Sequence, residues 1–177
     1  MNTHQSRAQT AQIVCTIRLL VTELHSRGLD YSAIENGIHD YPVSRRLIVE
    51  GSGYISFPDY RVKVYLNPVE RTLYYLFLNH PEGITSDDLV VHWKELCRIY
   101  SRESTFADSD FREDKIESLC SESKTVFYAT VSRIKRKFRE AVGNLNAEPF
   151  IIKKEKGGRY KVEEIDIIRT GPPLRRF

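Results

Sequence analysis

The sequence predicts an α+β fold, and three observations lead to this prediction. Short runs of alternating apolar and polar residues between 45 and 66 predict strands. Three helical patterns follow between 67 and 142. After them, alternating residues around a Gly-Gly pair predict a β-hairpin at 150–162. At 177 residues, the chain is long enough for one domain with a hydrophobic core and an appended element.

An extra helix is predicted near the N-terminus, from about Ser6 to Arg27. Its apolar residues recur on one face, and Gly28 ends the pattern. This face consists of Ile13, Ile17, Leu20, Val21 and Leu24. It either packs on the rest of the chain or forms a homodimer interface, and the pattern leaves both open. The segment 29–43 has no regular pattern, so residues 1–44 are expected to form a helix and an irregular linker.

Residues 45–163 are expected to form the main domain, which begins with a three-stranded antiparallel meander. The strands are predicted at 45–50, 54–57 and 61–66. A first helix is predicted to begin at Asn67-Pro68, because asparagine caps helices and proline suits the first helical position. Glu70 stands three residues after this cap, as a capping box requires.

A second helix is predicted to begin near 85–88, where acidic residues complement the helix dipole. Its apolar residues have helical spacing: Leu89, Trp93, Leu96, Cys97 and Tyr100. The next segment, 101–123, holds seven acidic and three basic residues, and we expect an acidic insertion with a short helix near 115–120. This insertion is a candidate site for a protein partner, or it shields basic groups elsewhere.

The third helix, predicted at about 123–142, combines a buried stripe with a polar face. The predicted buried residues are Phe127, Val131, Ile134 and Phe138. The opposite face carries Thr125, Tyr128, Ala129, Ser132, Arg136 and Arg139. A helix that enters the major groove of DNA needs such a face, because bulky side chains block approach and arginine can donate two hydrogen bonds to guanine.

The segment 124–162 is strongly basic. It holds eleven Lys and Arg residues against three Glu, a net charge of +8, whereas the first 123 residues have a net charge of −5. This asymmetry favours a polyanionic partner. A helix followed by a hairpin with a basic tip is the order of elements in a winged helix-turn-helix. The sequence therefore predicts a winged helix-turn-helix with an N-terminal antiparallel sheet and an extra N-terminal helix.

The segment from Arg45 to Glu163 resembles the DNA-binding domain of OmpR/PhoB-type transcriptional regulators. LNPVERTLYYLFLNHPEG at 66–83 is similar to that family's first helix, and TSDDLVVHW at 85–93 is similar to the start of its second. TVSRIKRKF at 130–138 resembles the third helix, and GGRYKV at 157–162 resembles the wing. The resemblance implies sequence-specific binding of duplex DNA and transcriptional regulation. Only 44 residues precede the first predicted strand, so the receiver domain of that family and phosphorelay control are not expected.

The DNA-binding residues are predicted on the third helix and the hairpin. The candidate base readers are Ser132, Arg133, Arg136 and Arg139, and the candidate wing contacts are Lys153, Lys154, Lys156 and Arg159. Further candidates are Lys124, Thr125, Tyr128 and Lys135. The family has an acidic residue at the position of Tyr128, a histidine at Thr130 and a glycine at Arg159. The alternative function is a winged-helix protein–protein interaction module without specific DNA binding.

No catalysis, cofactor, metal site or membrane segment is predicted. Ser121 and Lys124 match S-x-x-K but lack its supporting motifs, and His80, His92 and Cys97 lack a suitably spaced fourth metal ligand. Residues 1–12 lack the apolar core of a signal peptide, and no apolar run approaches the roughly 18 residues of a membrane span, so a cytoplasmic location is expected. Residues 164–177 are expected to form a C-terminal tail.

Overall fold

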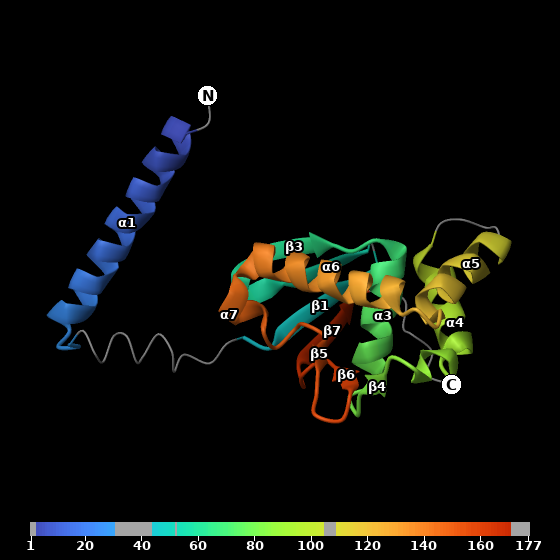
Figure 1. The fold of residues 1–177 in the computed structure, drawn as a ribbon. Helices are drawn as coiled ribbons and strands as arrows, with labels where there is room; N and C mark the ends of the chain where they lie inside the picture. The colour runs from blue at the N-terminus through green and yellow to red at the C-terminus, as the bar shows by residue number, and fades with distance from the viewer. Residues whose placement is uncertain (1–2, 31–43, 52, 105–108, 171–177) are drawn as a thin grey trace. The chain divides into compact units, whose positions relative to one another are not determined.

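The computed structural model describes residues 3–30, 44–51, 53–104 and 109–170, and the chain divides into two units, Met1–Pro42 and Val43–Phe177 (Figure 1). The first unit contains α1, Thr3–Ser26, which confirms the predicted N-terminal helix. After α1, Gly28 has a φ of 87°, in the left-handed region that glycine adopts without strain. Almost all of the predicted irregular segment 29–43 lies outside the described residues.

The second unit begins with the predicted antiparallel meander. Its strands are β1 (Arg46–Glu50), β2 (Tyr54–Phe57) and β3 (Val62–Tyr65), with the 3-10 turn η1 (Pro58–Tyr60) before β3. The register, with Ile55 opposite Val64, places both side chains in the core. Gly53 has a φ of 89°, and a Cβ atom there would collide with the guanidinium of Arg71, so this turn requires glycine.

A fourth strand, β7 (Asp166–Thr170), extends this sheet in the order β3-β2-β1-β7. It runs parallel to β1, with Arg46 opposite Asp166 and Glu50 opposite Thr170. The sequence pattern predicts an entirely antiparallel sheet and no strand in 164–177, and β7 corrects both expectations. The pairing joins residues that are far apart in the chain, so no turn residue marks it in the sequence.

The first helix of this unit, α3 (Pro68–Asn79), begins as predicted. The Asn67 side chain accepts a hydrogen bond from the Glu70 N–H at 3.0 Å, and the Glu70 carboxylate accepts one from the Asn67 N–H at 2.9 Å. Two backbone N–H groups at the start of α3 are satisfied in this way, which stabilises the predicted capping box.

The second predicted helix begins later than expected. Thr85 lies in the short strand β4 (Ile84–Thr85), a 3-10 turn η2 follows at Asp88–Val90, and α4 spans Trp93–Glu103. The Thr85 hydroxyl accepts a hydrogen bond from the Asp88 N–H at 3.2 Å and donates one to the Asp88 carboxylate at 2.8 Å. These bonds close a turn in place of a helical cap, so the expected start at 85–88 is wrong.

Three further helices follow. α5 (Ser109–Cys120) lies inside the acidic insertion 101–123 and is longer than the predicted helix near 115–120. Its buried side chains are Ile116, Leu119 and Cys120. α6 (Thr125–Val142) matches the third predicted helix within two residues. α7 (Asn144–Ala147) follows directly and is not predicted by the sequence pattern.

The predicted hairpin forms the second sheet. Its strands β5 (Lys153–Lys154) and β6 (Arg159–Lys161) are antiparallel, and β4 pairs with β6 to give the order β4-β6-β5. Gly83, with a φ of 82°, precedes β4, and a Cβ atom there would lie 3.2 Å from the carbonyl oxygen of Tyr160. A side chain at this position would therefore push β4 away from the hairpin.

Aromatic side chains join the first sheet to the helices. Phe138 of α6 packs edge to face against Phe57 of β2 and Tyr74 of α3, at ring-centroid distances of 5.1 and 5.2 Å. The carbonyl oxygen of Phe150 accepts a hydrogen bond from the Tyr74 hydroxyl at 2.9 Å. In Figure 1, α6 lies beside α3 and β3, in agreement with their contacts.

The part of the chain that the structure describes is thus a mixed α+β protein with six α-helices and two sheets, in agreement with the α+β class that the sequence predicts. Within the same residues, no helix combines the length and the apolar composition that crossing a membrane requires.

We expect Phe138→Ala to lower the free energy of unfolding by about 3–5 kcal/mol, because it removes a fully buried ring at this junction. Urea denaturation measures the loss. Leu145→Ala is the control, since Leu145 is exposed on α7 and its truncation should change stability by less than about 0.5 kcal/mol. Equal losses in the two variants would contradict the role of Phe138.

Candidate nucleic-acid interface

α6 is held by one buried face and exposes the other. Phe127, Ile134 and Phe138 are buried, as predicted, and Val131 is half-buried. The exposed positions are Thr125, Tyr128, Ala129, Ser132, Arg133, Arg136 and Glu140. The structure therefore separates the two faces as the helical period predicts, except that Arg139 is half-buried.

One lysine of α6 is bound to the protein interior. The ammonium of Lys137 lies 2.6 Å from the Glu70 carboxylate and donates a hydrogen bond to the Tyr65 carbonyl at 3.1 Å. Glu70 is only 1% exposed and also forms the capping box of α3. The pair links α6 to the start of α3, so the charge of Lys137 supports the fold. The sequence does not predict this link, because no local pattern relates residues 70 and 137.

The centre of the outer face carries two arginines and a serine. Arg136 and Glu140 lie 3.7 Å apart and are both 68% exposed, so their attraction is weak and easily exchanged. Arg133 is also exposed, and its Nε donates to the Ala129 carbonyl at 3.2 Å. Both guanidinium groups are accessible to an external acceptor, and the exposed Ser132 lies on the same face.

Two other predicted contacts are engaged with carboxylates. Arg139 lies 2.7 Å from Glu148, and Lys153 lies 3.1 Å from Glu148 and 2.7 Å from Glu163. The hydrogen bond from Arg139 holds the pKa of Glu148 below its ordinary value. Burial alone would lower the pKa of Lys153, but its hydrogen bonds to Glu163 and Glu148 outweigh this effect and raise it. These cations must exchange partners before they can bind a phosphate.

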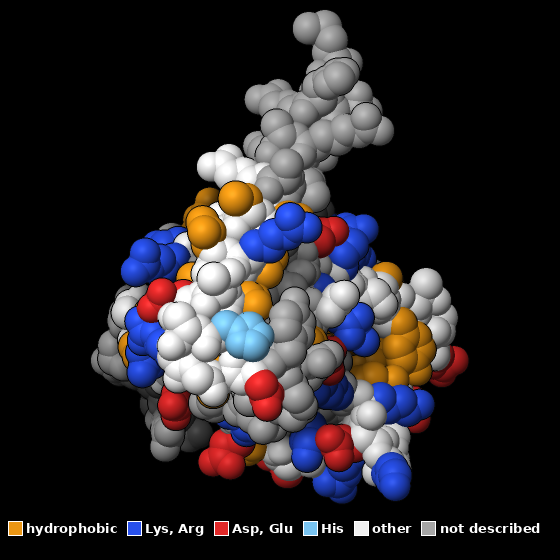
Figure 2. Space-filling view, turned by 90° about the vertical axis from the view of Figure 1, so that its left-hand side faces the viewer, with side chains coloured by type: hydrophobic (Ala, Val, Ile, Leu, Met, Phe, Trp, Pro, Cys, Tyr) orange, Lys and Arg blue, Asp and Glu red, His pale blue; other side chains and the backbone are white. Residues whose placement is uncertain are grey.

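Figure 2 shows Asp and Glu side chains next to Lys and Arg side chains on the face that it displays. The net charge of +8 between 124 and 162 therefore overstates the positive charge that this segment can offer to a ligand.

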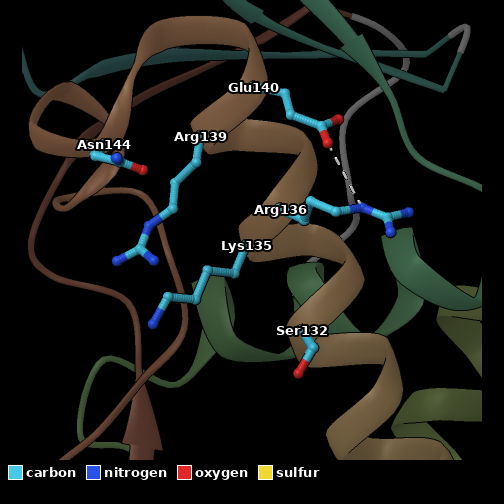
Figure 3. A pocket seen from close by; sticks show the side chains of 6 residues that line it. All are labelled: Ser132, Lys135, Arg136, Arg139, Glu140 and Asn144. Carbon is cyan, nitrogen blue, oxygen red and sulfur yellow. Dashed lines mark ion pairs between the residues drawn. The ribbon is translucent and has the colours of Figure 1, made fainter.

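A hollow of about 410 Å³ lies over the C-terminal half of α6 and the start of α7. Its lining side chains are Ser132, Lys135, Arg136, Arg139, Glu140 and Asn144. Figure 3 shows Lys135 and Arg139 extending on one side of α6 and Arg136 on the other, where it reaches toward Glu140. Four predicted DNA-binding residues thus meet at one concave surface. Its three cations and its hydroxyl are groups that bind phosphate oxygens.

The hairpin of β5 and β6 has an exposed tip. The Glu155 N–H donates to the Arg159 carbonyl at 2.7 Å, and Gly157 and Gly158 close the turn at φ values of 99° and 83°. The predicted wing residues Lys154, Lys156 and Arg159 are exposed. None of the three is paired with a carboxylate of the described residues at the distances found for Lys153 at the base of the hairpin.

Tyr160 attaches this hairpin to α6. Its buried ring packs edge to face on Phe127 at a centroid distance of 5.0 Å. The Lys154 ammonium lies 5.9 Å from the centroid of the same ring, within range of a cation–π interaction. The orientation of the hairpin therefore depends on the first turns of α6.

The N-terminal end of α6 presents two of its three predicted contacts to solvent. Thr125 and Tyr128 are exposed. Lys124, which precedes the helix in a left-handed conformation with a φ of 54°, has a side chain only 13% exposed, and its ammonium lies 3.5 Å from Asp87. Lys124 thus joins α6 to the segment before η2.

A separate polar cluster forms where the end of α3 and the start of α4 lie close together. His80, directly after α3, has its Nε2 atom 2.9 Å from a Glu95 oxygen, and the Nδ1 atom of His92 lies 3.7 Å from the same oxygen. Burial alone would lower the pKa of His80, but hydrogen bonds with Glu95 and Glu82 raise it. In the sequence, Cys97 is the residue weighed with these histidines as a metal ligand, whereas the structure places Glu95 beside them.

Comparisons of the chain with protein-family models, with curated proteins and with solved structures found no match. The resemblance to OmpR/PhoB-type regulators therefore stays a prediction from the sequence motifs. Conclusions about function depend on the geometry of α6, the hairpin and their charged side chains.

We expect adjacent cations of α6 to differ in their effect on stability. Lys137→Ala leaves the buried Glu70 carboxylate without its ammonium partner and should destabilise the fold by about 1–3 kcal/mol. Arg136→Ala removes an exposed charge and should change stability by less than about 0.5 kcal/mol. Thermal and urea unfolding measure both variants, and a larger loss for Arg136→Ala would refute this division.

Proposed function

We propose that the chain contains a winged helix-turn-helix domain of the OmpR/PhoB type, which binds duplex DNA sequence-specifically and regulates transcription. The observation that carries the proposal is the outer face of α6, where Ser132, Arg133 and Arg136 are exposed opposite the buried stripe of Phe127, Ile134 and Phe138. The hairpin that follows α6 offers three exposed cations at its tip. In this proposal, α6 enters the major groove and the β5–β6 hairpin is the wing.

The dimensions and chemistry of α6 support this role. A helix with its side chains is about 10–12 Å wide, and the major groove is about 12 Å wide. Small or hydroxyl side chains at Ala129 and Ser132 let the backbone come close to the bases. An arginine such as Arg136 can then donate two parallel hydrogen bonds to guanine, a contact that discriminates between bases by about 1–3 kcal/mol.

The hollow beside α6 and the hairpin tip supply a different kind of contact. Lys135 lines the hollow, and Lys154 and Lys156 belong to the hairpin. These ammonium groups suit phosphate oxygens, because a lysine binds phosphate as a point charge without the planar geometry that base reading requires. They would position the domain on the duplex without reading its sequence.

Homodimerisation through α1 is part of the proposal. Ile13, Ile17 and Leu20 on one face of α1 are 60%, 53% and 60% exposed. A second copy of this helix would remove these apolar side chains from water, which favours association. Two linked domains could then bind two DNA half-sites at once and so multiply specificity.

The acidic residues of α5 support a second role for the insertion. Glu113, Asp114 and Glu117 are exposed on α5, where they would repel DNA. A basic surface of a protein partner is the complementary ligand for them. This contact is compatible with DNA binding, and it becomes the main function if the chain is an interaction module.

The test of DNA binding is fluorescence anisotropy against a pool of random duplexes, titrated with salt and followed by selection of the bound sequences. We expect an enriched motif and a log–log salt slope of several units, about −0.9 for each phosphate contacted. Arg136→Ala should reduce the preference for the motif, whereas Lys154→Ala and Lys156→Ala should weaken binding to all duplexes alike.

Lys63→Ala is the matched control, since this exposed lysine lies on β3 and pairs with Glu50. It should leave binding unchanged. Absence of binding at about 50 mM salt, where electrostatic contacts are strong, would refute DNA binding and favour the interaction module. Equal losses on every sequence in all three binding variants would instead refute sequence reading by α6.

The dimer is tested by light scattering on the full chain after size-exclusion chromatography. Two aspartates introduced as Ile17→Asp and Leu20→Asp should convert a dimer into a monomer, because each would place a charge in the apolar interface. Thr22→Asp, on the opposite face of α1, should leave the dimer intact. A wild-type protein that is monomeric at tens of micromolar would refute association through α1.

A further inference from the structure

Two histidines and a glutamate converge where α3 ends and α4 begins. His80 directly follows α3, His92 directly precedes α4, and Glu95 lies in the first turn of α4. One potential ligand atom from each residue lies within 4.8 Å of the other two. The three side chains are 20–23% exposed, so the cluster is partly shielded but accessible to a small ion.

We propose that His80, His92 and Glu95 bind a divalent transition-metal ion of the zinc type. Imidazole nitrogen and carboxylate oxygen are both ligands that Zn²⁺ accepts, and two histidines with one glutamate are a known type of three-residue site that leaves one coordination position open. The site does not require that the chain bind DNA, so the proposals of metal binding and of DNA binding are tested independently of each other.

The distances suit this ion. Zinc bonds of about 2.0–2.1 Å place neighbouring ligand atoms of a tetrahedral site about 3.3 Å apart. The Glu95 carboxylate oxygen lies 2.9 Å from His80 Nε2 and 3.7 Å from His92 Nδ1, one shorter and one longer than this separation. The two rings are edge to face with centroids 4.5 Å apart, and the three ligand atoms lie within 4.8 Å of one another, so binding one ion requires the side chains to move closer together.

Glu82 supplies the outer contact that metal-binding histidines commonly have. Its carboxylate oxygen lies 2.7 Å from His80 Nδ1. An Nδ1–H that donates to Glu82 leaves a lone pair on Nε2, the nitrogen that faces Glu95. A second support is the side-chain N–H of Asn79, which donates to the other oxygen of Glu95 at 3.0 Å and orients that carboxylate.

The competing occupant of the same position is a proton. Two lone pairs at 2.9 Å would repel each other, so either a hydrogen atom or a metal ion must lie between His80 Nε2 and Glu95. A hydrogen on Nε2, in a neutral or a doubly protonated His80, satisfies this requirement without a metal. The experiment therefore has to distinguish a histidine–carboxylate hydrogen bond from a metal complex.

A bound ion would cross-link the two ends of the segment 80–92. This segment contains β4, which pairs with the hairpin strand β6, and the carbonyl of Glu82 accepts a hydrogen bond from Arg159 at 3.5 Å. Metal binding should therefore stabilise this segment and raise the melting temperature of the chain. At a zinc concentration about 100 times the dissociation constant, we expect a rise of about 5 °C or more.

The test uses the full chain without a polyhistidine tag, stripped of metal with a chelator. ZnCl₂ is titrated by calorimetry, and CoCl₂ by the visible absorption of a four-coordinate Co²⁺ complex. We expect one ion per chain. His92→Ala and Glu95→Gln should each weaken the affinity by at least about tenfold, and Glu82→Gln by about tenfold through loss of the contact that orients His80.

Two matched controls separate this site from other possibilities. His25→Ala removes a histidine of α1 and should leave the affinity unchanged. Cys97→Ser removes a half-buried thiol from the same helix as Glu95 and should also have no effect. Absence of a one-to-one complex, or affinity that is unchanged in both His92→Ala and Glu95→Gln, would overturn the proposal and leave a histidine–carboxylate network.

Discussion

The packing of Phe138 against Phe57 and Tyr74 is the interaction on which the rest of the structure depends. It joins α6 to the first sheet and to α3 through buried edge-to-face contacts. Because Phe138 must point inward, the helical period turns Ser132 and Arg136 outward. The ion pair between Lys137 and the buried Glu70 adds a second constraint on the rotation of α6. The exposed face of α6 is therefore a consequence of the core.

The charges of the basic segment divide into two groups with different roles. Lys137, Arg139 and Lys153 bind carboxylates of the protein at distances of 2.6–3.1 Å. The charged groups of Arg133, Arg136 and the hairpin tip are exposed. The first group holds α6 and the base of the hairpin in place, and the second can meet a ligand. A partner that binds this surface thus encounters a pre-oriented set of few cations, which favours specific contacts over general attraction.

Pairings between distant segments connect the parts of the second unit. The parallel strand β7 brings the segment after the hairpin back to β1, and β4 ties the segment between α3 and α4 to the hairpin. The close approach at Gly83 makes this second connection possible. Through it, the cluster of His80, His92 and Glu95 and the hairpin share a common support.

The sequence by itself determined the features that depend on neighbouring residues. The antiparallel meander, the capping box of α3, the extent of α6 and its buried stripe, and the hairpin turn follow from alternation, helical period and turn residues, which are local. Only the tertiary structure decided that α4 begins at Trp93 and that β7 pairs with β1. It also decided that Glu70 pairs with Lys137 and that Glu148 pairs with Arg139. It also decided that Glu95, and not Cys97, lies beside His80 and His92. These features depend on contacts between residues far apart in the chain or on the direction of a side chain, and neither leaves a periodic signal in the sequence.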